Sequence, residues 1–176
     1  CFLINHVNNF SKHYDVTIIT KINKEHKLEE KINNDCKLIN LNFSRDINLS
    51  SDLISLFYLI YLIFINKFYC VLTFTPKGGF LGMIASFLCR TKFRIHWFGG
   101  QVWVNRKGLI KNILKFFDKF IFLLSTQALT ECESQKIFLQ NENIVKPGYL
   151  NVLGSGSICG VDEKIFRPNK NLKSKI

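Results

Sequence analysis

The sequence lacks several short motifs by which nucleotide-dependent enzymes and metalloproteins are recognised. Its six cysteines form no C-x-x-C pair, which leaves zinc and thioredoxin-like sites without support. Neither G-x-x-x-x-G-K-[ST] nor G-x-S-x-G occurs, which excludes a P-loop NTPase and the nucleophile elbow of an α/β-hydrolase. The dinucleotide fingerprint G-x-G-x-x-G is incomplete, because Lys77 stands where residues 77–82 should begin with glycine.

Acidic residues are scarce relative to basic ones. The 176 residues include 24 Lys and Arg against 13 Asp and Glu, so the formal net charge is +11. Such an excess favours a nucleic-acid or anionic-membrane partner. Lys, Asn, Ile and Phe are abundant together, however, and a bias toward A/T-rich codons accounts for the charge equally well. Hydrophobic residues make up 47% of the chain, which is enough for one globular domain with its own core.

A long hydrophobic run is also lacking. The longest run has 13 residues, at 53–65, whereas a membrane-crossing helix needs roughly 20, so we expect a deeply buried helix here. There is no signal peptide, and the chain opens on Cys1 in what looks like the tail of a helix, so we expect a fragment. Cys70 and Cys89 fall in apolar runs, where a thiol packs as a small hydrophobe. A reduced, cytoplasmic chain is the simplest interpretation.

Short apolar runs alternate with helical patterns along the whole chain. Strands are expected near residues 16–20, 37–43, 70–74, 93–98, 127–131 and 149–153, with helices ending near 12 and spanning about 51–66, 80–88, 107–124 and 133–141. This alternation predicts an α/β fold with a Rossmann-like, doubly wound parallel sheet. A helix precedes the first recognisable strand, so we expect a further strand upstream, beside which the sheet reverses. Residues 1–166 would form the domain and 167–176 a linker.

The turn after residues 70–74 is the first candidate site. Pro76 cannot donate to a sheet ladder, so the strand must end before it, and the glycines that follow permit a tight turn. Ligands of open parallel sheets lie outside the carboxyl ends of the strands. We therefore expect binding by Thr75, Lys77, Gly78 and Gly79. The alternative is a connection shaped only for packing.

Further candidates follow the ends of other predicted strands. Loops at such positions concentrate binding residues, although a solvated surface is the alternative for each. Backbone N–H groups in loops rich in Gly, Ser and Thr, beside helix N-termini, favour anionic or polyhydroxyl ligands. These candidates are Gly100, Gln101, Arg106, Lys107 and Ser155.

Three other side chains have two interpretations each. His96 is a candidate cleft contact or base, but Ile95 and Trp97 flank it, and we favour a satisfied core histidine. Trp103 stacks on the ring of a ligand or packs in the core. Asp162 lines the cleft or caps a turn, and we favour the cap.

Four segments together carry a resemblance to a known family. They are TPKGGFLGMIA at 75–85, RIHWFGGQVWVNRKG at 94–108, ESQKIFL at 133–139, and VLGSGSICGVDEKIFRP at 152–168. With these segments the chain resembles the N-terminal domain of a family 4 glycosyltransferase of the GT-B fold. Two positions depart from the family pattern: Gly99 stands where many relatives have histidine, and Cys159 stands where asparagine usually precedes Gly-Val-Asp.

The resemblance implies a two-domain enzyme that moves a sugar from a nucleotide-sugar donor with retention at the anomeric carbon. In this family the N-terminal domain usually faces the acceptor, here a saccharide or a lipid-linked molecule, while the other domain binds the donor and carries paired glutamates. No catalytic residue, metal or further cofactor is therefore expected in this chain. The process would be the synthesis of a cell-surface polysaccharide in the cytoplasm, and the chain alone would be inactive.

Two alternatives come from other classes of protein. A nucleotide-binding α/β oxidoreductase or epimerase is disfavoured by the incomplete glycine fingerprint. A basic nucleic-acid-binding α/β module should expose aromatic side chains for base stacking on strands or loops, whereas most Phe here lie in core patterns.

The predicted helix at 107–124 carries a lysine every four residues, at Lys107, Lys111, Lys115 and Lys119. A basic amphipathic helix of this kind rests on an anionic membrane surface in many peripheral proteins, which suits a lipid-linked acceptor. The alternative, which we favour, is that the apolar side covers the sheet and the lysines are only solvated.

Overall fold

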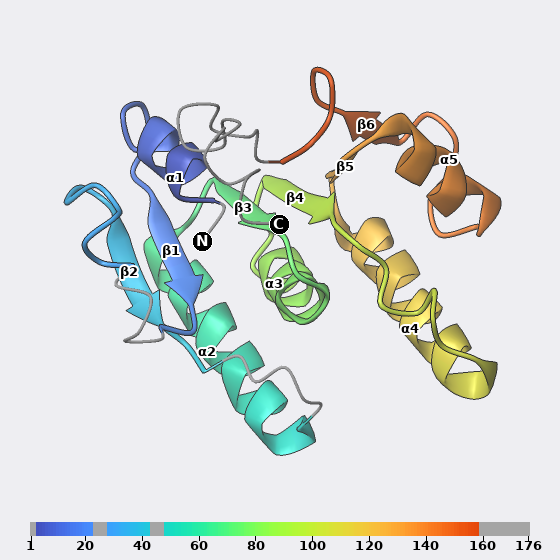
Figure 1. The fold of residues 1–176 in the computed structure, drawn as a ribbon. Helices are drawn as coiled ribbons and strands as arrows, with labels where there is room; N and C mark the ends of the chain where they lie inside the picture. Colours follow the sequence, from blue (N-terminus) through green and yellow to red (C-terminus); the bar gives the residue numbers. More distant parts are fainter. Residues whose placement is uncertain (1–2, 23–27, 43–47, 159–176) are drawn as a thin grey trace, which may run out of the picture.

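The computed structural model describes residues 3–22, 28–42 and 48–158 (Figure 1). Strands and helices alternate through these residues, as the sequence predicts. The strands are β1 (Thr17–Thr20), β2 (Lys37–Asn40), β3 (Cys70–Thr73), β4 (Phe93–Phe98), β5 (Gln127–Thr130) and β6 (Leu150–Val152). The helices are α1 (Ile4–Phe10), α2 (Leu49–Asn66), α3 (Pro76–Leu88), α4 (Gly108–Leu124) and α5 (Glu133–Asn141).

All pairs of neighbouring strands are parallel, which confirms the predicted α/β class. In the described ranges the strands form two hydrogen-bonded groups, β1-β2 and β3-β4-β5-β6. Both groups share one layer of helices, because Ile19 of β1 and Val71 of β3 pack against the same cluster between α2 and α3. The fold is thus Rossmann-like. The further strand expected upstream of β1 in the sequence, which would lie between β1 and β3 in the sheet, stays a prediction. The proposed linker at 167–176 lies outside the described residues.

The main core lies between the sheet and α3, α4 and α5 (Figure 1). Successive residues of β4 point to opposite faces. Phe98 therefore joins Met83 and Ile121 in this core, while Trp97 packs on the other face with Leu129. Because of this alternation, His96 and Phe98 lie on the face of the sheet that the helices cover, and Trp97 lies on the opposite face.

Two helices begin earlier than expected. Thr75 caps α3, its Oγ1 accepting from the N–H of Gly78 at 3.2 Å, so the helix starts at Pro76 rather than after Gly79. Proline suits this first position because its missing N–H has no intrahelical partner there. The cap of α2 is Asn48 and not a serine at 50 or 51: its Oδ1 accepts from the Ser51 N–H at 3.2 Å.

The expectation that α2 is deeply buried is wrong. Only Ser55, Leu59, Leu62 and Ile63 are buried, and they face α3 and the β1-β2 pair. The helix is long and apolar enough to cross a membrane by length and composition, yet it packs sideways on α3 within the fold. Its apolar residues encircle the helix, so the sequence pattern could not tell which side is covered.

Neither interpretation of the α4 lysines agrees with the structure in full. Lys111 and Lys115 lie over the indole of Trp103, with Nζ 5.8 and 5.4 Å from a ring centroid, and Lys115 also binds Glu142 at 2.7 Å. These two lysines therefore pack inward. Apolar residues of α4 are exposed instead, among them Ile113 and Phe116.

The two cysteines assigned to apolar packing differ. Cys89 is half-buried and its thiol donates to the Ile60 carbonyl at 3.5 Å. Cys70, at the start of β3, is exposed, so it does not pack as expected. Cys159 and Asp162 lie outside the described residues.

Candidate functional site

The loops after β3, β4, β5 and β6 open on one edge of the sheet. Register fixes this arrangement: Thr73 pairs with His96, Phe98 with Thr130, and Thr130 with Val152. Parallel strands joined by crossovers bring all their carboxyl ends together. The expectation that the turn at 75–79, the loop at 99–101 and the turn at 154–157 share one edge is therefore confirmed. We call this the carboxyl edge.

The turn at the start of α3 is held by close packing around its glycines. A Cβ on Gly78 would lie 2.7 Å from Thr75 Oγ1, and a Cβ on Gly79 would meet the ring of His96, with Nδ1 at 2.8 Å. Neither glycine has a positive φ, so the requirement is space and not backbone conformation. These residues let α3 approach β4 closely.

His96 lies beneath this turn in the core. Its side chain is 3% exposed, its Nδ1 is 2.8 Å from Thr73 Oγ1, and its ring meets Phe98 edge-on at 4.6 Å. Burial lowers the pKa of His96 to about 3, so the imidazole is neutral near pH 7. The structure thus favours the core interpretation, and His96 does not reach the open edge.

Lys77 is paired with α2. Its Nζ donates to Asp52 Oδ1 at 2.7 Å, and both side chains are about one-fifth exposed. This ion pair joins the first turns of α2 and α3. The lysine is therefore engaged in holding two helices together.

Trp103 anchors the loop between β4 and α4. The indole is fully buried, stacks on Phe138 with centroids 5.4 Å apart, and donates from Nε1 to Asp118 Oδ2 at 2.7 Å. Burial raises the pKa of Asp118 to about 6, although the Trp103 hydrogen bond opposes the increase. Core packing, and not stacking on a ligand, is thus the role that the contacts of Trp103 support.

With Trp103 fixed, the loop presents its other residues outward. Gln101 is half-buried, and its Nε2 donates to the Gly99 carbonyl at 2.6 Å. Arg106 and Lys107 are exposed, and Gly100 has open space where a Cβ would stand. Of the predicted residues in this loop, Gln101 is held by its hydrogen bond to Gly99, and Arg106 and Lys107 are accessible to a ligand.

Gln135 of α5 connects the loops of the carboxyl edge, and the prediction missed it. Its Nε2 donates to the Gly99 carbonyl and, at 3.3 Å, to Gln101 Oε1. Its Oε1 accepts from the Glu131 N–H at 3.0 Å and from the Thr130 hydroxyl. One amide thereby ties β4, β5 and α5 together. Gln135 lies within the segment ESQKIFL, one of the four that carry the family resemblance, and that resemblance was the sequence feature that could have pointed to it.

The turn after β6 packs against the end of β5. The Ser157 N–H donates to the Glu131 carbonyl at 2.6 Å, and a Cβ on Gly156, at φ +90°, would collide with the same carbonyl. Ser155 is exposed at the tip of this turn. Glu131 itself was not predicted; its Oε1 lies 4.0 Å from where a Gly99 Cβ would stand, which puts a carboxylate on the carboxyl edge.

The structure therefore gathers part of the predicted set. Two predicted residues are engaged within the fold: Lys77 is paired with Asp52, and His96 lies in the core. Within the described part of the chain, no group of three His, Cys, Asp or Glu could hold a metal ion. The residues that share the carboxyl edge are Thr75, Gly100, Gln101, Glu131, Gln135 and Ser155, with Arg106 and Lys107 in the loop that follows β4.

Half-buried amides and a half-buried carboxylate at strand ends, together with an exposed hydroxyl and exposed cations, suit a polyhydroxyl or anionic ligand. A comparison with models of known protein families finds no match. Among curated proteins, the chain is similar to the capsular polysaccharide biosynthesis glycosyltransferase CapM of Staphylococcus aureus, with 33% identity over 165 residues. The similarity supports a relation to glycosyltransferases of polysaccharide biosynthesis. It covers 93% of this chain and 42% of CapM, so the chain spans less than half the length of that relative.

Proposed function

We propose that the chain is the acceptor-side part of a glycosyltransferase that builds a cell-surface polysaccharide. The single observation that carries this proposal is the 33% identity to CapM along nearly the whole chain. The carboxyl edge supports it, because polar side chains from three loops converge there. In this proposal the enzyme belongs to family 4 with a GT-B fold and transfers a sugar from a nucleotide-sugar donor with retention of configuration.

The acceptor would approach the carboxyl edge. Gln101 can bond sugar hydroxyls with the part of its amide that Gly99 and Gln135 leave free, while the amide of Gln135 is fully used in holding the loops. Glu131 offers a carboxylate that accepts hydrogen bonds. Arg106 and Lys107 provide cations for a diphosphate or another anionic part of a lipid-linked acceptor. The enzyme would act in the cytoplasm, in peripheral contact with an anionic membrane, and without a metal or further cofactor.

The alternatives predict different ligands. An oxidoreductase or epimerase would bind a nicotinamide dinucleotide, and a nucleic-acid module would bind DNA with strong dependence on salt. Exposed aromatic residues are more numerous than the sequence suggested, but Phe57, Tyr61, Phe64 and Phe116 lie on helices. Tyr14, Tyr69 and Tyr149 on loops and Phe93 at the start of β4 are exposed as well, so the DNA-binding measurement below, and not the position of the aromatics, separates this alternative from the proposal.

The test is sugar transfer by the complete gene product. Labelled UDP- and GDP-sugars are incubated with it and with membrane lipids, with and without EDTA. Radioactivity in the lipid or polysaccharide fraction, unaffected by EDTA, is expected. Absence of transfer together with dinucleotide or DNA binding would refute the proposal.

A companion measurement uses the 176-residue chain alone. Because we assign the donor to another domain, isothermal titration with UDP- and GDP-sugars should give no measurable heat of binding. Micromolar affinity would contradict that assignment.

A further inference from the structure

Helix α2 presents an uncovered apolar face to the outside of the fold. The side opposite its buried residues is exposed along more than three turns, and Phe57 and Phe64 are 62% and 71% exposed. Soluble monomers rarely expose a continuous apolar patch of this kind unless it binds something. The exposed large residues of this face, which we call the α2 face, are Leu53, Ile54, Phe57, Tyr58, Tyr61, Phe64 and Ile65.

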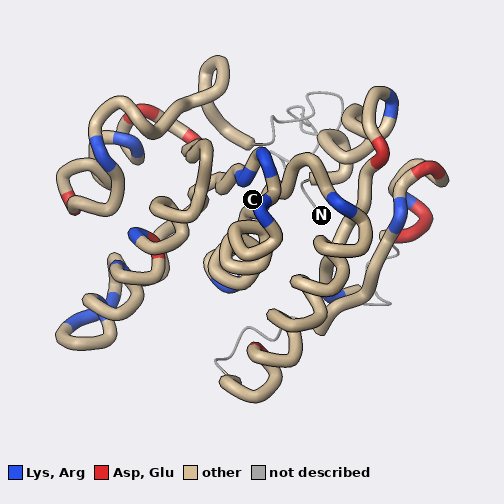
Figure 2. The backbone as a smooth tube through the Cα atoms, turned by 180° about the vertical axis from the view of Figure 1, so that it is seen from behind, with Lys and Arg blue, Asp and Glu red and all other residues tan. Residues whose placement is uncertain are grey.

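The sequence that follows Asp52, in the first turn of α2, contains no acidic residue over a long stretch. From residue 53 to residue 117 there is no Asp or Glu, although nine basic residues occur. In the tube view of Figure 2, α2 is tan through its middle, so charge lies around the face and not on it. The nine are Lys67, Lys77, Arg90, Lys92, Arg94, Arg106, Lys107, Lys111 and Lys115.

Three of these cations border α2 at the amino-terminal edge of the sheet. Lys67 caps the C-terminus of α2 in the left-handed conformation, at φ 49°. Arg90 and Lys92 follow α3, whose C-cap Cys89 donates to the Ile60 carbonyl of α2. Lys92 also lies 5.1 Å from the ring centroid of Tyr69, which is 63% exposed. Cations and exposed apolar groups are therefore neighbours here.

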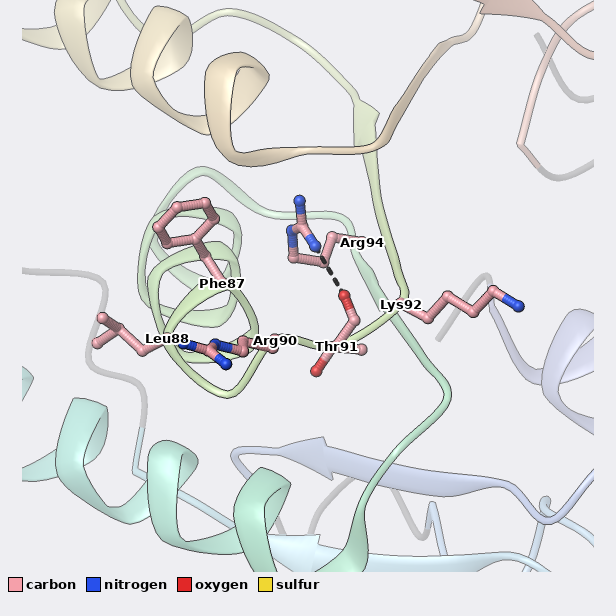
Figure 3. Close-up of a pocket in the computed structure, with 6 residues that line it drawn as sticks. All are labelled: Phe87, Leu88, Arg90, Thr91, Lys92 and Arg94. Atoms are coloured by element: carbon pink, nitrogen blue, oxygen red, sulfur yellow. Dashed lines mark hydrogen bonds between the residues drawn. The ribbon is translucent and has the colours of Figure 1, made fainter.

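A pocket of about 550 Å³ opens at the C-terminal end of α3, where Arg90 and Lys92 line it (Figure 3). Arg94 lines it but is committed to the fold, since it donates to the carbonyls of Thr91 and Leu124 at 2.7 Å. The Thr91 hydroxyl is buried and has no hydrogen-bond partner among the described residues. Apolar walls come from Phe87 and Leu88. Such a lining accommodates an anionic headgroup next to an acyl chain.

We propose that the α2 face and its bordering cations Lys67, Arg90 and Lys92 dock the protein on an anionic lipid membrane. The helix would lie in the plane of the interface, with Phe57 and Phe64 below the headgroups. Tyr58, at the edge of the α2 face, would stand at headgroup level, where aromatic rings with a polar end are favoured. The proposal specifies the membrane contact included in the proposed function and moves it from the α4 lysines to α2.

Charge complementarity selects the membrane over a second copy of the chain. Two copies that met through the α2 face would bring Lys67, Arg90 and Lys92 either against one another or against the start of the partner's α2. The acid there, Asp52, is already paired with Lys77, so the cations would stay without an offsetting charge in both arrangements. An anionic bilayer meets both requirements of the surface at once. It covers the apolar residues and neutralises the cations around them.

The test is flotation of the complete gene product with phosphatidylcholine vesicles that contain or lack phosphatidylglycerol. We expect binding only to the anionic vesicles and a decrease with added salt. Phe57→Ser should weaken this binding about tenfold, in proportion to the apolar surface withdrawn from the bilayer. Lys67→Asn should weaken it about fivefold, the loss that one basic residue near an anionic surface produces.

Matched variants control for general effects. Tyr14→Ser removes an aromatic side chain that is 70% exposed outside the α2 face, and Lys37→Asn removes an exposed lysine on β2. Neither should change flotation. Since all four positions are exposed, the variants should keep the parent's circular dichroism spectrum.

Three outcomes would overturn the proposal. One is equal binding to neutral and anionic vesicles. Another is a loss of vesicle binding in Tyr14→Ser and Lys37→Asn that equals the loss in Phe57→Ser and Lys67→Asn. The third is a dimer in sedimentation that Phe57→Ser converts to monomer, which would make the α2 face a contact between copies. A failure of this proposal can be distinguished from a failure of the proposed function. In the complete gene product, Phe57→Ser should leave sugar transfer to a detergent-solubilised acceptor unchanged while it weakens binding to vesicles.

Discussion

Replacing Gly79 with alanine should destabilise the chain, although alanine is the better helix former. The new Cβ would stand 2.8 Å from His96 Nδ1 and still closer to the neighbouring ring carbon. The ring cannot swing aside, because Thr73 and Phe98 hold it in the core. Overpacking of this kind costs about 1–3 kcal/mol, and the helix propensity of alanine returns up to about 1 kcal/mol. We expect a net loss of about 1–2 kcal/mol.

A double-mutant cycle isolates the cause. In a His96→Ala background the collision is gone, so Gly79→Ala should become neutral or stabilising by up to about 1 kcal/mol. Urea unfolding followed by far-UV circular dichroism gives the free energy of each variant. Gly100→Ala is the matched control: no atom lies within 4 Å of the added Cβ and φ is not positive, so its effect should stay within about 0.5 kcal/mol. If Gly79→Ala costs the same with and without the imidazole, the close packing described for this turn is wrong.

The remaining predictions concern the buried acid and the last turn. Because the folded-state pKa of Asp118 is raised from 3.8 to about 6, its stabilising contribution is complete below pH 3.8 and is lost as the pH rises through 6. His96 has the opposite dependence, so the quantity to measure is the difference in unfolding free energy between the parent and Asp118→Asn. This difference should fall by about 2 kcal/mol from pH 4 to 7, and a constant difference would exclude the assignment. Gly156→Ala should cost about 2 kcal/mol or more, because it combines a positive φ with a collision at the Glu131 carbonyl, whereas Gly154→Ala, also at positive φ but in open space, should cost about 1 kcal/mol. Equal losses in thermal unfolding would remove the role given to the Glu131 contact.

The order of elements was predictable because each strand is a short apolar run between polar turns. Residues 93–98 and 127–130 are examples, and their parallel register follows from the alternation with helices. The shared carboxyl edge followed from topology alone. That inference needed no knowledge of side-chain contacts.

Side-chain partners were not predictable from spacing. Lys77 binds Asp52, 25 residues earlier, because α2 and α3 start side by side. Lys111 and Lys115 point inward, since Trp103 and Glu142 come from elements whose positions the α4 pattern does not contain. Gln135 was missed for the same reason: its amide acts on loops that meet only in the folded chain.

Sugar transfer by edge-specific variants tests the central claim, that the carboxyl edge receives the acceptor, most directly. In the complete gene product, Gln101→Ala and Arg106→Ala should each lower transfer to the lipid or polysaccharide fraction at least tenfold, the effect of about 1.4 kcal/mol at the transition state. Lys146→Ala removes an exposed cation before β6, at the opposite edge, and should leave transfer unchanged. Unaltered transfer in the Gln101 and Arg106 variants, or an equal decrease in the Lys146 variant, would contradict the account.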